Sequence, residues 1–152
     1  LMQIAPKWAD IEWIIAHTSL PVILKGIVHP QDAKLALQYG VQGLIISNHG
    51  GRVLDTCISP LTALQLIKKV VPTNFPLILD GGIRRGSDVF KALALGATAV
   101  CIGRPYIYGL ATAGALGVAH VLKILKEEFE ITMALMGTAT VNDINQKHIL
   151  HN

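Results

Sequence analysis

The sequence predicts an α/β protein built on a parallel β-sheet. Short apolar runs such as "PVILKG" (21–26) alternate with amphipathic runs such as "HPQDAKLALQYG" (29–40), and a strand followed by a helix occurs four times. Hydrophobic residues make up 51% and charged residues 15% of the 152 residues. Such an apolar composition is expected where helices cover both faces of a parallel sheet. Short connections between the alternating elements then imply parallel strands joined by right-handed crossovers.

The order of apolar and amphipathic runs predicts each element in turn. Strands, with the loops that follow some of them, are predicted at 21–26, 41–51, 75–86 and 99–105. Helices are predicted at 8–18, 29–40, 59–71, 87–97 and from about 115 to 136. Pro30 suits the first turn of its helix and Gly40 suits its end. Ser59 is the expected N-cap of the next helix, with Pro60 at the first helical position.

Two architectures fit this order of elements: an open doubly wound sheet and part of a (βα)8 barrel. In both, ligands bind beyond the carboxyl ends of the strands. Polar and glycine residues gather at those predicted ends, namely Lys25, Ser47, His49, Arg52, Asp80, Arg84, Gly103 and Arg104. A shared binding site explains this placement better than packing does.

Two consecutive loops have the composition of a phosphate site. "DGGIRRG" (80–86) opens the third helix with Gly81 and Gly82, and "IGRP" (102–105) follows the next strand. Glycines allow the backbone to approach a ligand, and N–H groups at a helix start favour an anion. Arg84 and Arg104 would add charge-assisted bonds to phosphate oxygens. We therefore predict phosphate binding at these loops.

The other two loops have the composition of a reacting site. His49 is a candidate base near neutral pH, and the planar guanidinium of Arg52 suits a substrate carboxylate. Lys25 would stabilise negative charge that develops on an electron-rich ring. Together these groups describe the oxidation of an α-hydroxy acid. Ser47 would donate to a cofactor ring or cap the turn, and Asp80 would bond a sugar hydroxyl or brace its loop.

Charge, cysteine content and hydropathy argue against several other classes of protein. The net charge of +3 is mild and the basic residues are scattered, so no nucleic-acid partner is predicted. Cys57 and Cys101 lack metal or redox spacing, no metal is predicted, and Cys101 is expected to be a buried core thiol. No apolar run approaches the roughly 18 to 20 residues of a membrane span. We predict a cytoplasmic protein, or a peripheral membrane protein if it is a respiratory dehydrogenase.

In their order and spacing, "LKGI", "SNHGGR", "DGGIRRGSDVFKALALGA" and "IGRP" resemble the C-terminal half of the FMN-dependent α-hydroxy acid dehydrogenases. This family includes glycolate oxidase, lactate oxidase, flavocytochrome b2 and bacterial lactate dehydrogenases. The resemblance extends from about Trp8 to Ile144. It implies FMN as cofactor and oxidation of a small 2-hydroxy acid, such as lactate or glycolate, to the 2-oxo acid. The implied electron acceptor is oxygen, a quinone or a cytochrome.

The resemblance also implies a role for each matching residue. His49 matches the catalytic base, which also contacts the substrate, and Arg52 matches the arginine that holds the substrate carboxylate. Lys25 matches a contact at the N1 and O2 edge of the flavin. The implied cofactor-binding residues are Lys25, Ser47, Asp80, Gly81, Gly82, Ile83, Arg84, Gly103 and Arg104.

The length of the chain implies only part of the family's barrel. A complete (βα)8 barrel needs roughly 250 residues, whereas this chain has 152. We predict that residues 1–152 form a single half-barrel, (βα) units 5–8 of a TIM barrel. A half-barrel exposes two sheet edges and an apolar face. We therefore expect a homo-oligomer or pairing with an N-terminal half-barrel, and the alternative function is a non-catalytic or partner-dependent fragment of such an enzyme.

Overall fold

The computed structural model describes residues 5–150, so residues 1–4 and 151–152 of the predicted domain lie outside the described part. The strands are β1 (Ile23–Lys25), β2 (Gly43–Ser47), β3 (Leu77–Asp80) and β4 (Ala99–Cys101). The α-helices are α1 (Trp8–Ala16), α2 (Pro30–Gln38), α3 (Pro60–Lys68), α4 (Gly86–Ala94) and α5 (Arg104–Leu135). Short 3-10 helices are η2 (His49–Gly51), η3 (Val141–Asp143) and η4 (Gln146–His148). The predicted order of elements is confirmed, although each strand is shorter than its predicted range.

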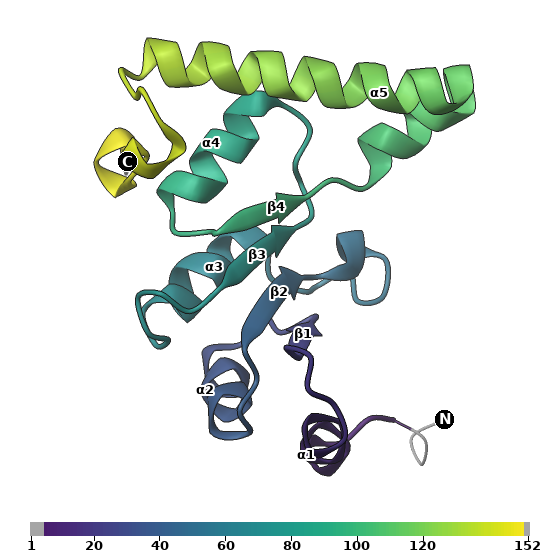
Figure 1. Ribbon diagram of the computed structural model, residues 1–152, viewed down its shortest axis with the longest axis vertical. Coiled ribbons are helices and arrows are strands. Elements are labelled where there is room, and N and C mark those ends of the chain that lie inside the picture. The colour runs from purple at the N-terminus through teal and green to yellow at the C-terminus, as the bar shows by residue number, and fades with distance from the viewer. Residues whose placement is uncertain (1–4, 151–152) are drawn as a thin grey trace.

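The strands form one parallel sheet in the order of the chain, β1-β2-β3-β4, within the described residues (Figure 1). A doubly wound sheet would reverse its strand order at a switch point. No reversal occurs over these four strands, and this consecutive order favours the barrel among the two predicted architectures. The register places Ser47 opposite Asp80, and Asp80 opposite Cys101. The carboxyl ends of β2, β3 and β4 therefore lie at one level.

The two faces of the sheet differ in burial. One face carries Leu44, Ile46, Leu77 and Leu79, which are buried with alanine and aliphatic side chains of α2, α3 and α4. Residues at alternate positions point to the opposite face, and there Ile23 is 43% exposed. The expectation that helices cover both faces is therefore wrong for the described residues. Ile23 is thus an apolar side chain left exposed on that face.

Local sequence signals fix the helix starts. The Ser59 hydroxyl accepts a hydrogen bond from the Thr62 amide at 3.2 Å, as expected for an N-cap, and Pro60 begins α3. Pro30 begins α2 in the same way, and the His29 side chain accepts from the Gln31 amide at 3.2 Å. These caps place the loops that precede α2 and α3 at the same edge of the sheet as the strand ends.

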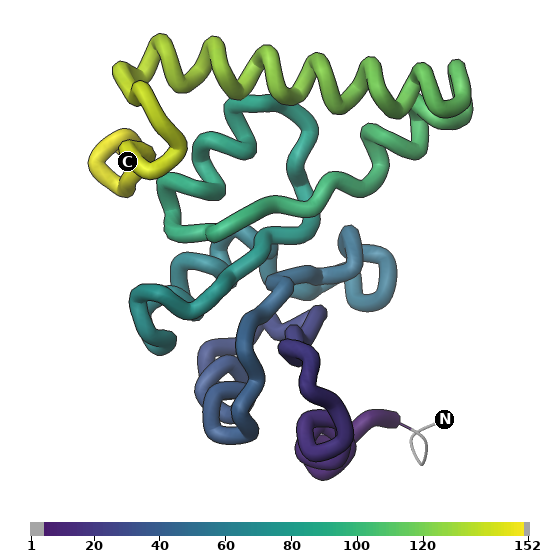
Figure 2. The backbone as a smooth tube through the Cα atoms, in the orientation of Figure 1, coloured from purple at the N-terminus to yellow at the C-terminus, as the bar shows by residue number. Residues whose placement is uncertain are grey.

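The last helix differs most from its prediction. It begins at Arg104 rather than near residue 115, and its backbone is kinked at Ala113 and Gly114. Gly109 and Gly117 lie against each other across the kink, where neither has room for a side chain. The tube in Figure 2 shows the chain turning back at this point, so that the long second segment crosses above α4. The first segment therefore stays beside the strand ends.

By length and composition, α5 is the one helix within residues 5–150 that is apolar and long enough to cross a membrane. Only 6% of its apolar window is buried. This finding corrects the prediction that no apolar run approaches that length. A single such helix is weak evidence for a membrane protein, and the kink divides this one into two segments.

Candidate functional site

A pocket of about 620 Å³ opens at the carboxyl ends of the four strands. Ten of the eleven residues predicted for the site line it: Lys25, His49, Arg52, Asp80, Gly81, Gly82, Ile83, Arg84, Gly103 and Arg104. They come from the loops after all four strands. The structure thus brings the predicted phosphate residues and the predicted reacting residues to a single cavity.

The remaining predicted residue, Ser47, lies behind the pocket wall and is 1% exposed. Its hydroxyl donates to Asp80 Oδ2 at 2.7 Å and accepts from Lys25 Nζ at 3.2 Å. Lys25 Nζ also contacts Asp80 Oδ2 directly at 2.7 Å. Burial alone would raise the pKa of the Asp80 carboxyl, but the bonds from Lys25 and Ser47 outweigh it and hold that pKa below its ordinary value. Asp80 is therefore an anion fixed in place by two strands.

The loop that carries His49 has an unusual backbone. His49 has a φ of +55°, the one positive φ of a non-glycine residue among residues 5–150, and such a conformation is uncommon for a residue with a side chain. The amide of His49 donates to Ser47 Oγ at 3.1 Å, and the amide of Gly50 donates to Asn48 Oδ1 at 3.1 Å. The side chains of Ser47 and Asn48 thus hold this turn, and His49 lines the pocket.

The predicted anion site at the start of α4 needs correction. Asp88 Oδ2 already accepts from the amides of Arg84 and Arg85, at 3.1 and 3.0 Å. The amide of Gly86 donates to Glu128 at 2.9 Å. These bonds satisfy donors that the N-terminus of α4 would otherwise offer to a ligand. These three amides are therefore already bonded, and the guanidinium of Arg84 is a group from this loop that would meet an anion.

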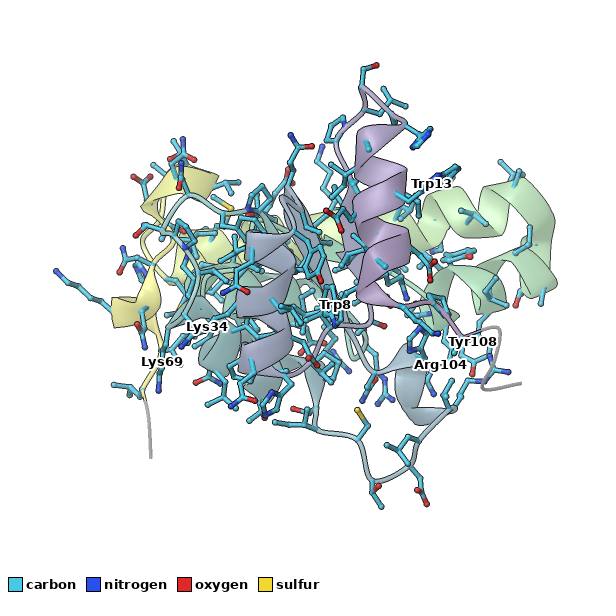
Figure 3. The ribbon with its side chains drawn as sticks, turned by 90° about the horizontal axis from the view of Figure 1, so that it is seen from below. Trp8, Trp13, Lys34, Lys69, Arg104 and Tyr108 are labelled. Carbon is cyan, nitrogen blue, oxygen red and sulfur yellow. The ribbon has the colours of Figure 1, made fainter. Side chains whose placement is uncertain are left out.

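The start of α5 is different. Its N-cap is Gly103, and no side chain within the described residues caps it. Gly103 and Arg104 both line the pocket. Figure 3 shows Arg104 beside Tyr108, on the side of the molecule away from the surface lysines Lys34 and Lys69. An uncapped helix start with a guanidinium beside it fits a phosphate group.

Sequence analysis missed five residues of the pocket wall: Gly50, Val53, Cys101, Pro105 and Ile107. Cys101 is partly buried and lines the pocket, so the prediction of a core thiol is wrong. Cys101 is the last residue of β4 and lies opposite Asp80, and its place at a strand end is the feature that could have assigned it to the pocket. Burial raises the pKa of the Cys101 thiol, and the charge of Asp80 raises it further, against the opposing charge of Lys25. Residues 5–150 contain no cluster of His, Cys, Asp and Glu fit to hold a metal ion.

Comparison with known proteins gives consistent results. The profile of the family described as FMN-dependent dehydrogenase matches residues 1–151. The chain is 57% identical over 142 residues to a 2-hydroxyacid oxidase of Dictyostelium discoideum, covering 93% of this chain and 37% of that protein. It is 52% identical over 143 residues to an L-lactate oxidase of Alicycliphilus denitrificans, covering 94% and 39%.

A solved structure has the same fold. Mandelate oxidase with benzoyl-formic acid superposes with a TM-score of 0.89 and is 43% identical, covering 93% of this chain and 42% of that one. The chain thus spans about two fifths of the length of these relatives. Its parallel sheet is similar to the TIM barrels of FMN-dependent oxidases, and the partial coverage is consistent with part of such a barrel. On sequence and structure, the chain belongs to the family of FMN-dependent dehydrogenases.

Proposed function

We propose that this chain is the half of an FMN-dependent enzyme that binds the cofactor and holds the reacting groups. The whole enzyme would oxidise a small 2-hydroxy acid, such as lactate or glycolate, to the 2-oxo acid. The observation that carries the proposal is the single pocket in which His49, Arg52 and Lys25 lie with Arg84 and Arg104. Relatives at 52–57% identity are named as 2-hydroxyacid and L-lactate oxidases.

The residues of the pocket fit the parts of FMN. Arg84 and Arg104 suit the phosphate, and Gly103 at the uncapped start of α5 lets it approach the backbone. A Cβ at Gly82 or Gly103 would meet no atom of the described residues within 4 Å, so the backbone there is open to a ligand. Asp80 suits a ribityl hydroxyl, and Gly81 and Ile83 complete the same loop. Lys25 suits the electron-rich edge of the flavin ring.

The reacting groups suit a hydroxy acid. FMN, when bound, supplies the acceptor for the two electrons that leave the substrate. Arg52 would hold the substrate carboxylate and so orient the α-carbon. An imidazole nitrogen of His49 would accept a proton from the substrate. The ammonium of Lys25 would counter negative charge that develops on the ring, and Ser47 would hold both Lys25 and the His49 loop in place.

We further propose that residues 1–152 are units 5–8 of the barrel and that an N-terminal half-barrel or a second copy covers the open sheet face. The exposed Ile23 and the coverage of 37–39% of the relatives support this arrangement. It also gives the alternative function, in which the chain alone is a non-catalytic, partner-dependent half-barrel. Sedimentation with and without FMN tests both: a stable, colourless monomer with no FMN affinity contradicts each of them.

The names of the relatives provide information on the electron acceptor and on the cellular location of the enzyme. They are oxidases, so we propose oxygen as the electron acceptor in preference to a quinone or a cytochrome. Two relatives from Arabidopsis thaliana are named as peroxisomal. We therefore propose a peroxisomal location as an alternative to the cytoplasmic one predicted from the sequence.

Two neighbouring arginines provide the direct test of the cofactor site. Arg84 lines the pocket, whereas Arg85 does not and lies 3.9 Å from Glu128. We expect Arg84→Gln to weaken FMN binding at least about ten-fold, and Arg85→Gln to leave it within about two-fold. The measurement is FMN fluorescence titration of the full-length protein, followed by anaerobic reduction with lactate or glycolate. Absence of a flavin spectrum in the wild type, or equal loss in both variants, contradicts the proposal.

A further inference from the structure

We propose that Gly26 is a positioning residue for His49: the absence of a side chain at Gly26 sets where the imidazole lies. The inference rests on the proposed function, in which His49 is the base. A Cβ built on Gly26 would lie 2.9 Å from Cε1 of His49, 3.7 Å from Nε2 and 3.9 Å from Nδ1. Carbon atoms in contact lie about 3.5–4.0 Å apart. The ring therefore occupies the space that any side chain at this position would need.

The backbone of Gly26 is held by a hydrogen bond to β2 that a movement away from the ring would break. It follows Lys25 directly, and its amide donates to Ile45 O at 3.0 Å, which continues the pairing of β1 with β2. Its φ of +97° is a conformation that favours glycine. Gly26 is thus fixed at the end of one strand.

The backbone of His49 is fixed from the neighbouring strand. Its amide is bonded to Ser47 Oγ, the hydroxyl that also binds Lys25 and Asp80. With both backbones held, a side chain at Gly26 displaces the imidazole itself. A shift of about 1 Å in a reacting group costs roughly 100-fold in rate. Gly26 therefore controls the placement of the base relative to a substrate held by Arg52.

Gly40 offers a matched control. Its φ is +80°, close to that of Gly26, but a Cβ there would meet nothing within 4 Å among the described residues. Gly40→Ala and Gly26→Ala thus impose similar backbone strain. They differ in the contact with His49, so a difference between the two variants reports that contact.

The test uses the full-length protein with FMN bound. We expect Gly26→Ala to shift the Cε1–H NMR signal of His49, assigned with His49→Gln, and to slow flavin reduction by lactate or glycolate at least ten-fold. FMN affinity should stay within three-fold, and Gly40→Ala should change neither signal nor rate. An unmoved His49 signal in a folded Gly26→Ala protein, or equal shifts in both variants, overturns the inference. If the wild type does not reduce flavin, the proposed function fails, while the NMR comparison still decides the contact.

A double variant covers the case in which Gly26→Ala folds poorly. His49→Gly removes the ring and suits the positive φ at that position. We expect Gly26→Ala to lower the urea midpoint in the wild-type background at least twice as much as in the His49→Gly background. Equal losses in both backgrounds would mean that backbone strain, and not the ring, makes glycine necessary, which overturns the inference.

Discussion

Lys25 and Asp80 form an ion pair across two strands that are not neighbours. Lys25 ends β1 and Asp80 ends β3, with β2 between them, yet Nζ and Oδ2 lie 2.7 Å apart. Ser47, at the end of β2, binds both groups. This three-residue network, Lys25–Ser47–Asp80, ties together the ends of β1, β2 and β3. It also joins the side of the pocket assigned to the reaction to the side assigned to phosphate.

The network predicts a pH dependence of stability. The folded-state pKa of Asp80 is lowered from the ordinary 3.8, so its contribution is full above that pH and is lost as pH falls through the lowered value. Lys25→Met removes bonds and charge that lower this pKa. We expect the rise in unfolding free energy from about pH 2 to about pH 4 to become smaller in that variant, by less than about 1 kcal/mol because Lys25 is 45% exposed.

Urea denaturation of the wild type and Lys25→Met across this range measures the difference. Asp143 also has a lowered pKa, from hydrogen bonds with the Thr140 hydroxyl and amide. It should titrate alike in both proteins, so its contribution cancels in the comparison. Identical pH slopes would show that the ion pair contributes nothing to stability.

We expect Ser47→Ala to lower the free energy of unfolding substantially, although it removes only one oxygen atom. The variant removes one of the two donors to Asp80 Oδ2 and leaves the His49 amide without its acceptor, while Lys25 keeps its ion pair with Asp80. We expect a loss of about 1–3 kcal/mol in unfolding free energy, because buried polar groups lose their partners. Ser59→Ala, which removes an exposed N-cap, should cost about 1 kcal/mol and leave the pocket unchanged. Chemical denaturation with FMN titration checks both, and FMN affinity unaltered by Ser47→Ala would separate the network from the cofactor site.

His49→Gln tests the assignment of the base. Glutamine fills a similar volume but does not accept the proton, so the flavin should remain bound while its reduction by substrate slows at least about 100-fold. Stopped-flow absorbance of the full-length protein gives the reduction rate. His29→Gln is the control, since that ring caps α2 and does not line the pocket. Rapid reduction in His49→Gln would remove His49 from the role of base.

Arg52→Lys tests the carboxylate clamp. Lysine keeps the charge but loses the planar pair of donors. We expect the KM for a 2-hydroxy acid to rise about ten-fold, which corresponds to about 1.4 kcal/mol, with FMN affinity unchanged. Steady-state kinetics of the full-length protein measures this. An unaltered KM and rate would mean that the carboxylate binds elsewhere.

Much of the fold and of the candidate site follows from sequence because strand ends and glycine loops have local signals. Pro30, Pro60 and Ser59 mark helix starts, and the polar residues after each strand mark the pocket. Long-range contacts have no such signal. At the start of α4, for example, the amide of Gly86 donates to Glu128, which lies on α5 and is distant in sequence. The early start of α5 was missed because Gly109 and Gly114 weaken a helical pattern, whereas here Gly114 forms the kink and Gly109 packs against Gly117 across it.

The consecutive strand order also has a consequence for how the molecule is made. Each strand pairs with the next one along the chain, so the residues of the pocket are synthesised in the order of the strands that carry them. Lys25 and Ser47 precede Asp80, which completes the three-residue network at the end of β3. Arg104, at the start of α5, comes last. Lys25, His49 and Arg52, assigned to the reaction, are thus synthesised before the two arginines assigned to the phosphate.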